Sequence, residues 1–403
     1  LTFTGSANKF REFRLNSNTT IELGSGATSI NNGGSNGISS TTGGVINATG
    51  GTLTFASDAD NSSATGTTLT VNAKITGAIR FEACCSTGTV VLTNSNNDFT
   101  ANNQINNGTI LQVDVIGNSG APSRLGTGTT ILLNNASPVL KYTGTGETNN
   151  RIIDLQTGTA GTSIIDNSGT GLLKFTSNVT RTGTQVRTLQ LQGSTSGIGE
   201  ISGIIPNNSA TNTTPITKTG TGTWILSGVN TFTGATTVSN GTLLLNSAPT
   251  GVSATTVNGG VLGGSSTAYP GTITVNAAGT LDPGGTIGAA GKLSTTAAVN
   301  LNVAGATYRV QLGLSTTPGT TYDQLTSSAN INIANATLAG SLTGPITASG
   351  VYDIITTTGA GLISGTFAGL LDGAMLYIGG EKFQITYGGG VGTATAVRLT
   401  AQN

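Results

Sequence analysis

Hydrophobic and polar residues alternate in short runs along most of this chain. The clearest run is residues 222–246, GTWILSGVNTFTGATTVSNGTLLLN. Its main apolar positions are Trp224, Leu226, Phe232, Val238, Leu243 and Leu245. Alternation with a period of two, bounded by Gly, Asn and Ser, is typical of β-strands that are buried on one face. The run therefore predicts three strands joined by two turns.

The same pattern occurs earlier, in residues 88–113, GTVVLTNSNNDFTANNQINNGTILQV. Gln112 falls where the pattern has an apolar residue, so the register there is predicted to shift to Leu111 and Val113. The turn glycines of the repeats are Gly88, Gly108, Gly222, Gly241, Gly260 and Gly279. The last four recur every 19 residues. A period near 20 in strand-like units predicts a solenoid, in which each rung packs on its neighbours.

The expected fold is all-β, a parallel β-helix (β-solenoid) of about twenty short rungs. At a strand spacing of about 4.8 Å, such a stack would form a rod on the order of 90–100 Å long. Changes in spacing divide it into N-terminal rungs (1–85), middle rungs with irregular loops (86–215), regular 19-residue repeats (216–290), and C-terminal rungs with closing strands (291–403).

Residues 222–245 resemble the autotransporter-associated strand repeat, also called the passenger-associated transport repeat, nearly position for position. Residues 88–113 resemble it more loosely, and the segments 281–285 (LDPGG) and 380–392 (GEKFQITYGGGVG) look like later parts of such proteins. The resemblance implies a right-handed parallel β-helix and an exported bacterial protein located outside the cell or on its surface. It implies no reaction.

Charge is scarce, which narrows the classes of partner. Only 8% of residues are charged, and 16 basic residues balance 16 acidic ones. A basic patch for nucleic acid or anionic lipid is therefore not expected. The surface should consist of Ser, Thr, Asn and Gly, and low charge favours association between molecules. No stretch approaches the roughly 20 apolar residues of a membrane-spanning helix.

The two ends of the chain are predicted to dock onto another subunit. The sequence begins directly in a strand pattern without an initiator Met, which indicates a mature, processed product or a trimmed segment. Residues 1–23 are the richest in charge and interleave it with aromatic side chains, which fits either a capping rung or a docking strand. The residues expected at the subunit contact are Phe3, Phe10, Arg11, Phe13, Arg14, Val397 and Leu399.

Cys84 and Cys85 are the only cysteines, and neighbours on a strand point to opposite faces. Three alternatives follow: one buried and one exposed thiol, a strained disulfide between the two, or a disulfide to another subunit. With no histidine and no second cysteine pair, neither a metal site nor a cofactor is expected.

Catalysis is not expected either. A β-helix that degrades polysaccharides would need clustered carboxylates, whereas here most are isolated: Asp154, Asp166, Asp282, Asp323, Asp353 and Asp372. Asp58 and Asp60 form a short like pair that fits a turn better than a calcium loop. Threonine-rich runs do not repeat at the rung spacing, which argues against ice binding.

Two functions of different classes remain. The first is a structural protein whose rods stack end to end into a fibre or surface layer, because terminal rungs leave strand edges unpaired. Its partners would be copies of itself. The second is a monomeric adhesin that presents loops, such as residues 204–215, to glycans or other cells. A polysaccharide-degrading enzyme is a minor third alternative.

Overall fold

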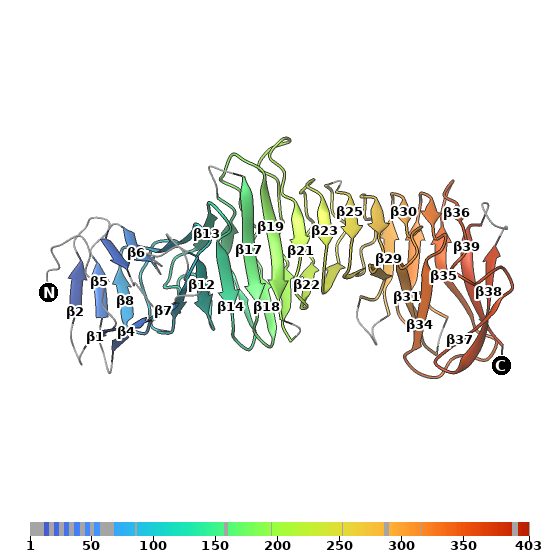
Figure 1. Cartoon of the computed structure of the whole chain (residues 1–403), viewed down its shortest axis with the longest axis horizontal. Helices are drawn as coiled ribbons and strands as arrows, with labels where there is room; N and C mark the ends of the chain where they lie inside the picture. Colours follow the sequence, from blue (N-terminus) through green and yellow to red (C-terminus); the bar gives the residue numbers. More distant parts are fainter. Residues whose placement is uncertain are drawn as a thin grey trace. The chain divides into compact units, whose positions relative to one another are not determined.

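The computed structural model describes residues 12–15, 20–23, 28–31, 36–40, 45–48, 52–56, 68–84, 87–156, 160–194, 196–251, 253–285, 290–314, 316–388 and 394–402, with the backbone alone before residue 68. Every regular element in these residues is a β-strand. The chain divides into two compact units, Leu1–Thr214 (unit 1) and Pro215–Asn403 (unit 2). Figure 1 shows the strands of each unit stacked in ladders.

Unit 1 contains four parallel ladders. Sheet 1 has the order β1 (Glu12–Leu15), β4 (Asn36–Ser40), β7 (Thr68–Val71), β10 (Thr89–Leu92), β12 (Ile110–Val113), β14 (Val139–Tyr142), β17 (Gly161–Asn167), β19 (Arg187–Gly193). Sheet 2 has the order β3 (Thr28–Asn31), β6 (Thr52–Ala56), β9 (Arg80–Cys84), β11 (Asn103–Asn106), β13 (Thr130–Asn134), β16 (Ile152–Asp154). Sheet 3 is β2 (Thr20–Leu23), β5 (Val45–Ala48), β8 (Lys74–Gly77), and sheet 4 is β15 (Glu147–Asn149), β18 (Leu172–Phe175), β20 (Ile198–Ile201).

Unit 2 contains three ladders. Sheet 5 has the order β21 (Ile216–Lys218), β23 (Thr236–Val238), β25 (Thr255–Val257), β27 (Ile273–Val275), β30 (Val299–Asn300), β33 (Ile331–Asn332), β36 (Ile363–Ser364). Sheet 6 has the order β22 (Thr223–Leu226), β24 (Thr242–Leu245), β26 (Val261–Gly263), β28 (Thr280–Asp282), β31 (Thr307–Leu312), β34 (Thr337–Leu342). Sheet 7 has the order β29 (Lys292–Thr295), β32 (Gln324–Ser327), β35 (Val351–Thr357), β39 (Ala396–Ala401), β38 (Glu381–Gly388), β37 (Met375–Ile378).

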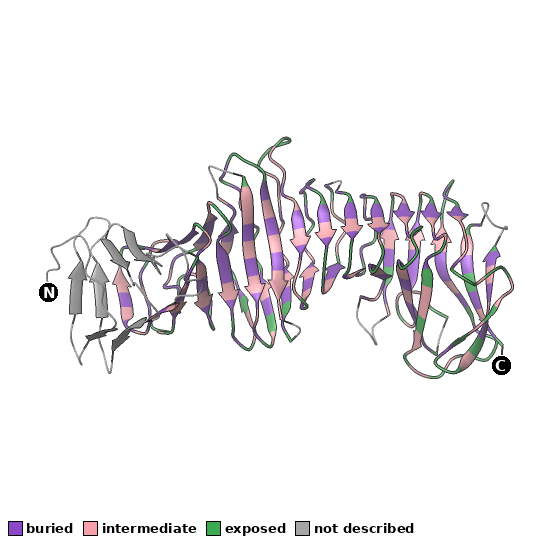
Figure 2. Cartoon of the chain, viewed as in Figure 1, coloured by how far each residue is buried: buried purple, intermediate pink, exposed green. Residues whose placement is uncertain are grey.

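The cores are columns of like residues that run from rung to rung. In unit 1 one column follows the register of sheet 1 through Leu69, Val90, Leu111, Leu140, Ile165 and Leu191. In unit 2 another follows sheet 6 through Trp224, Leu243, Leu262, Leu281 and Tyr308. All are buried, and Figure 2 shows the buried and half-buried positions alternating along the strands. Because successive side chains of a strand point to opposite faces, the apolar positions of the alternating sequence face the core and the polar positions face outward.

The parallel β-solenoid predicted from the sequence is confirmed, whereas its right hand and its number of rungs stay predictions. Leu111 and Val113 point inward and Gln112 does not, so the predicted shift of register is correct. The 19-residue step is equally clear, since Thr223 pairs with Thr242, Thr242 with Val261 and Val261 with Thr280.

The end of unit 2 departs from the parallel pattern. In sheet 7, β39 lies antiparallel between β35 and β38, and β37 forms a hairpin with β38. The predicted pairing of closing strands is thus correct. These strands cover the last parallel strand of their sheet, β35, with the chain's own backbone.

Candidate functional site

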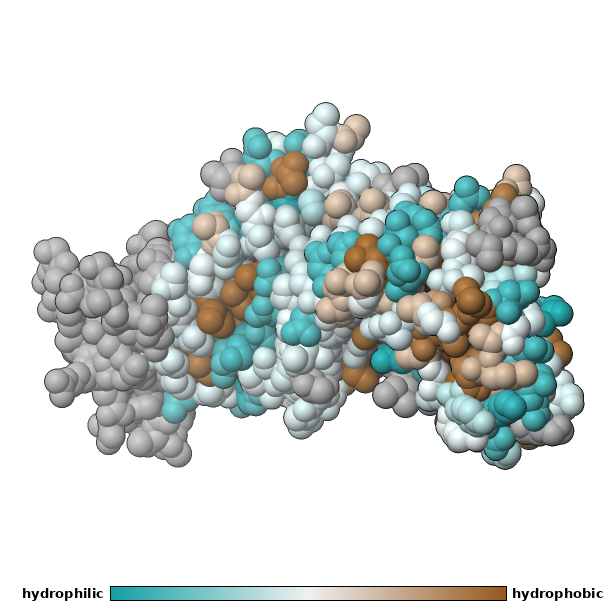
Figure 3. Space-filling view, turned by 45° about the vertical axis from the view of Figure 1, so that its right-hand side comes forward, coloured by the Kyte–Doolittle hydropathy of each residue, from teal (hydrophilic) through white to brown (hydrophobic). Residues whose placement is uncertain are grey.

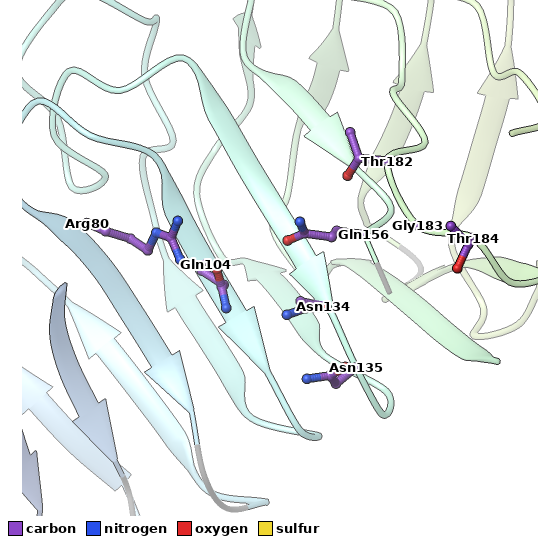
Figure 4. A pocket seen from close by; sticks show the side chains of 8 residues that line it. All are labelled: Arg80, Gln104, Asn134, Asn135, Gln156, Thr182, Gly183 and Thr184. Carbon is purple, nitrogen blue, oxygen red and sulfur yellow. Dashed lines mark hydrogen bonds between the residues drawn. The ribbon is translucent and has the colours of Figure 1, made fainter. Parts of the chain in front are cut away.

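A polar pocket of about 410 Å³ lies on the outer face of sheet 2 in unit 1 (Figure 4). Eight residues line it: Arg80, Gln104, Asn134, Asn135, Gln156, Thr182, Gly183 and Thr184. Their side chains offer amides, hydroxyls and one guanidinium, and none is apolar. Such a lining makes hydrogen bonds in both directions, because amides and hydroxyls both donate and accept.

Successive rungs supply one wall of this pocket. β9, β11 and β13 are neighbours in sheet 2, and they contribute Arg80, Gln104 and Asn134. Their inward neighbours Phe81, Ile105 and Leu133 are buried in the core, so the period of two directs the polar side chains outward. Arg80 Nη1 donates a hydrogen bond to Gln104 Oε1 at 3.0 Å, which fixes the guanidinium over the neighbouring rung.

The opposite wall is the turn of residues 182–184, which a buried carboxylate holds in place. Asp154, at the end of β16, accepts hydrogen bonds from the Thr182 amide at 3.1 Å and from Thr182 Oγ1 at 2.7 Å. Asn208 Nδ2 donates to the carbonyl oxygen of Gly183. The exposed loop around Asn208, which the sequence identified as a display loop, therefore adjoins the pocket.

Two buried arginines border the same pocket. Arg187 is fully buried at the start of β19, where Nε donates to Ser163 Oγ at 2.8 Å and Nη2 donates to the carbonyl oxygen of Asn135. Arg181 directly precedes the lining turn and donates from Nη2 to the Gln185 carbonyl oxygen at 2.7 Å. Burial lowers the pKa of Arg187 to about 10, and the charge of Arg181 adds to this effect. The Arg187 side chain therefore remains cationic at neutral pH.

Sequence reasoning missed this site. Asn, Gln and Thr occur throughout the chain, so the lining residues carry no local signal. Arg187 occupies a core-facing position of an alternating run, RTLQLQ, and that position is the one signal that could have identified a buried cation.

The predicted isolation of the acids is wrong for one pair in unit 2. Asp282 and Asp323 are both fully buried, and burial together with the Asp282 charge raises the pKa of Asp323 to about 7. Each carboxylate is already engaged, since Asp282 pairs with Arg309 at 2.5 Å and Asp323 accepts two backbone N–H groups. Without exposure to solvent, this pair fits a structural role better than a catalytic one.

No group of three His, Cys, Asp or Glu residues forms a metal site in the described ranges. Asp58 and Asp60 lie outside those ranges. None of the described segments forms a helix of the length and apolarity that a membrane span requires.

The structure holds Cys84 as a disulfide rather than a thiol, and this side chain is buried. Cys85, the one other cysteine of the chain, lies outside the described residues.

Some of the predicted docking residues lie in strands of the structure, and the others lie outside the described residues. Val397 and Leu399 are fully buried in β39, between β35 and β38, so their side chains point into unit 2 rather than toward a partner. The backbone of Phe13 and Arg14 forms part of β1. The remaining docking residues of the N-terminal segment, Phe3, Phe10 and Arg11, lie outside the described residues. Subunit docking at this end stays a prediction.

The turn glycines serve two different physical needs. Gly108 and Gly241 have φ angles of 78° and 64°, a left-handed backbone that favours glycine. Gly260 and Gly279 have no such angle, but a Cβ there would lie 2.7 Å and 2.5 Å from a carbonyl oxygen of another rung. Close stacking of rungs, rather than turn geometry, requires glycine at these two positions.

Comparison with known proteins bears on the role of these repeats. The model of the passenger-associated transport repeat matches residues 86–111 and 216–245. These are the two stretches in which the sequence pattern was recognised, so the predicted repeat family is confirmed there.

A longer likeness is to a curated protein, the adhesin BmaC autotransporter of Brucella suis biovar 1 (strain 1330). The two are 34% identical over 135 residues, which is 32% of this chain and 4% of that protein. The chain thus matches only a small part of this relative. The repeats and the likeness place the chain among exported proteins of the cell surface or the extracellular space.

Proposed function

We propose that this chain is a non-enzymatic, adhesive segment of an exported protein, built on passenger-associated transport repeats. Three findings support it: the repeats, the partial likeness to an autotransporter adhesin, and the polar pocket beside an exposed loop in unit 1. The pocket is the single observation that carries the binding role, because its lining of amides, hydroxyls and one guanidinium can hydrogen-bond a polar ligand.

The surface chemistry fits adhesion to polar material. In Figure 3 most of the coloured surface on the visible face is white or teal, with brown patches scattered over it. Charged side chains are few, and some of them pair with each other, as Lys74 does with Asp98 and Lys174 with Glu200. A charge-poor surface of hydroxyls and amides binds by hydrogen bonds, which suits glycans on another cell.

Cell binding tests this function directly. Fluorescently labelled chain should bind cultured cells saturably and be displaced by unlabelled chain. A variant with residues 208–211 replaced by Gly and Ser should bind much less, because these exposed residues adjoin the pocket. The same replacement at the exposed residues 95–96, in another turn of unit 1, is the matched control. Absence of saturable binding by the unaltered chain would refute the adhesive role.

The polysaccharide-degrading alternative is less well supported. Its candidate acids, Asp282 and Asp323, are buried and already bonded to the protein. Release of reducing ends from acidic or neutral polysaccharides by the purified chain would overturn the non-enzymatic proposal.

We retain self-assembly into a fibre or layer as a second proposal, on one observation. β34 ends sheet 6 with mostly half-buried or exposed side chains, and β37 ends sheet 7 with Met375 and Tyr377 exposed. Edge strands of this kind can accept a strand from another copy. Sedimentation velocity over a wide concentration range tests it, and a single monomer species at all concentrations would rule it out.

A further inference from the structure

Cationic side chains lie at the lining of the pocket in unit 1 and next to it. Three guanidiniums belong to it: Arg80 lines it, Arg187 donates to the lining residue Asn135, and Arg181 directly precedes the lining turn. Among the described residues, the carboxylates bonded to the elements near these arginines are Glu82, which accepts from Asn106 Nδ2, Asp154, which accepts from Thr182, and Asp166, which accepts from Gln192 Nε2 of β19. The three guanidiniums thus stand against three carboxylates, and Arg80 is the one charged residue among those that line the pocket.

The two buried guanidiniums have unused hydrogen-bonding capacity. Arg181 Nε and Arg187 Nη1 are buried atoms without a hydrogen-bond partner. Among the described residues, neither arginine hydrogen-bonds to a carboxylate: Arg181 donates to the carbonyl oxygens of Leu155 and Gln185, and Arg187 to a hydroxyl and a carbonyl. The charge of Asp154 acts on Arg181, whereas the charge that acts on Arg187 is the like charge of Arg181. The field of a buried cation is weakly screened, so the positive potential of Arg187 extends into the adjoining pocket.

The lining narrows the class of anion. Gln104, Asn134 and Gln156 offer amides at neighbouring rungs, as the close-up shows, and Thr182 and Thr184 add hydroxyls (Figure 4). No aromatic side chain lines the pocket to stack a nucleic-acid base, and no apolar one to hold a lipid chain or a hydrophobic peptide. Alternating amides and hydroxyls match the hydroxyl groups of a sugar ring.

We propose that this pocket binds the anionic group of an acidic saccharide, a uronate carboxylate or a sulfate ester, with Arg80 as its direct partner. The amide and hydroxyl side chains bind neighbouring sugar hydroxyls, and Arg187 supplies a favourable field from behind the lining residues. The ligand class rests on the adhesive function proposed above, which concerns the same surface of unit 1.

Calorimetric titration of the full chain with three oligosaccharides of equal length tests this ligand class: a uronate, a sulfated one and a neutral one. At least one acidic ligand should bind about tenfold or more tightly than the neutral one, and its affinity should fall as salt is added. The two acidic arms tell the carboxylate from the sulfate. Equal affinity for all three, or binding of none, would overturn the proposal.

Variants locate the site. Arg80→Gln removes the direct partner, and Asn134→Asp places a negative charge in the lining; each should weaken acidic-ligand binding by about tenfold. Lys382→Gln, at an exposed cation of unit 2, is the control and should leave binding unchanged. Circular dichroism verifies that each variant is folded. Unchanged affinity in both pocket variants would place the ligand elsewhere and overturn the assignment.

Cell binding separates this inference from the proposed function. If the chain binds cells but calorimetry shows that it binds no acidic oligosaccharide, the proposed ligand class is wrong and the adhesive function stands. If the chain binds acidic oligosaccharides in the pocket but does not bind cells, the ligand class is supported and the adhesive function is wrong.

Discussion

Asp323 is fully buried, with one carboxylate oxygen 2.7 Å from the amide nitrogen of Gly291 and the other 2.8 Å from that of Gln311. Burial is the main cause that raises its pKa to about 7 from 3.8, and the charge of Asp282 adds to it. The folded chain therefore holds a proton at this site more tightly than the unfolded chain does. The contribution of Asp323 to stability is full below about pH 4 and is lost as pH rises to about 7.

We expect the melting temperature of unit 2 to fall between pH 5 and pH 8, with Asp323 contributing at most on the order of 4 kcal/mol. Asp282→Asn should flatten this dependence, because it removes a charge that raises the pKa. Asp372→Asn, at an exposed acid, should not. Thermal unfolding followed by circular dichroism at several pH values measures both. A melting temperature that is constant over this range in the unaltered chain contradicts the assignment.

For individual residues, the sequence predicted which apolar side chains form the core but not which charged side chains are buried. Trp224, Leu226 and Leu243 are buried as predicted, because alternation marks an inward face directly. Lys218, in contrast, is fully buried at the end of β21, where Nζ donates to the Thr219 and Gly220 carbonyl oxygens at 2.6 Å and 3.0 Å. A lysine in a polar run is normally solvated, and only the fold brings these carbonyls together around it.

Rung stacking depends on glycine at positions that the sequence pattern marked only as turns. A Cβ at Gly260 would lie 2.7 Å from the Gly241 carbonyl oxygen and 2.8 Å from Val238 Cγ1. Real Cβ atoms do not approach backbone this closely, so the rungs would have to separate.

Gly260→Ala should therefore destabilise unit 2 by about 1–3 kcal/mol, as overpacking does in a well-packed core. Gly344→Ala is the matched control, because a Cβ there meets nothing within 4 Å and φ is not positive. Chemical denaturation of both variants gives the two free energies of unfolding. Equal stability of the two would mean that rungs can absorb a methyl group at this position.

Elements of the regular repeats were predictable because each strand, turn and register repeats the one before. The pocket was not, because it joins β9, β11 and β13 to a turn near residue 183, a hundred residues from Arg80. Asn135 shows the difficulty: its left-handed φ of 56° and its bond to Arg187 follow from stacking, not from local sequence.

On the scale of whole units, the parallel ladder of unit 2 needs a terminator, and the antiparallel strands β37, β38 and β39 supply one. Their inward side chains are buried at Phe383, Ile385, Tyr387, Val397 and Leu399. Without them, β35 would present an unpaired strand edge and apolar surface to other molecules.

Deleting residues 372–402 should therefore cause the chain to form large, disordered aggregates at micromolar concentration. Size-exclusion chromatography with light scattering measures this. Tyr377→Ser, a change at the exposed edge strand that keeps the three strands, is the control and should not form such aggregates. A deletion variant that stays soluble and folded would show that these strands do not terminate the ladder.

The constant step between pairing residues of sheet 6 has a consequence for how such a molecule can change. A block of 19 residues inserted at Gly241 would find the same kind of neighbour above and below that the existing blocks have. Duplication of that block could therefore lengthen unit 2 without a compensating substitution anywhere else. In such a design, the length of the unit depends on how many blocks the chain contains.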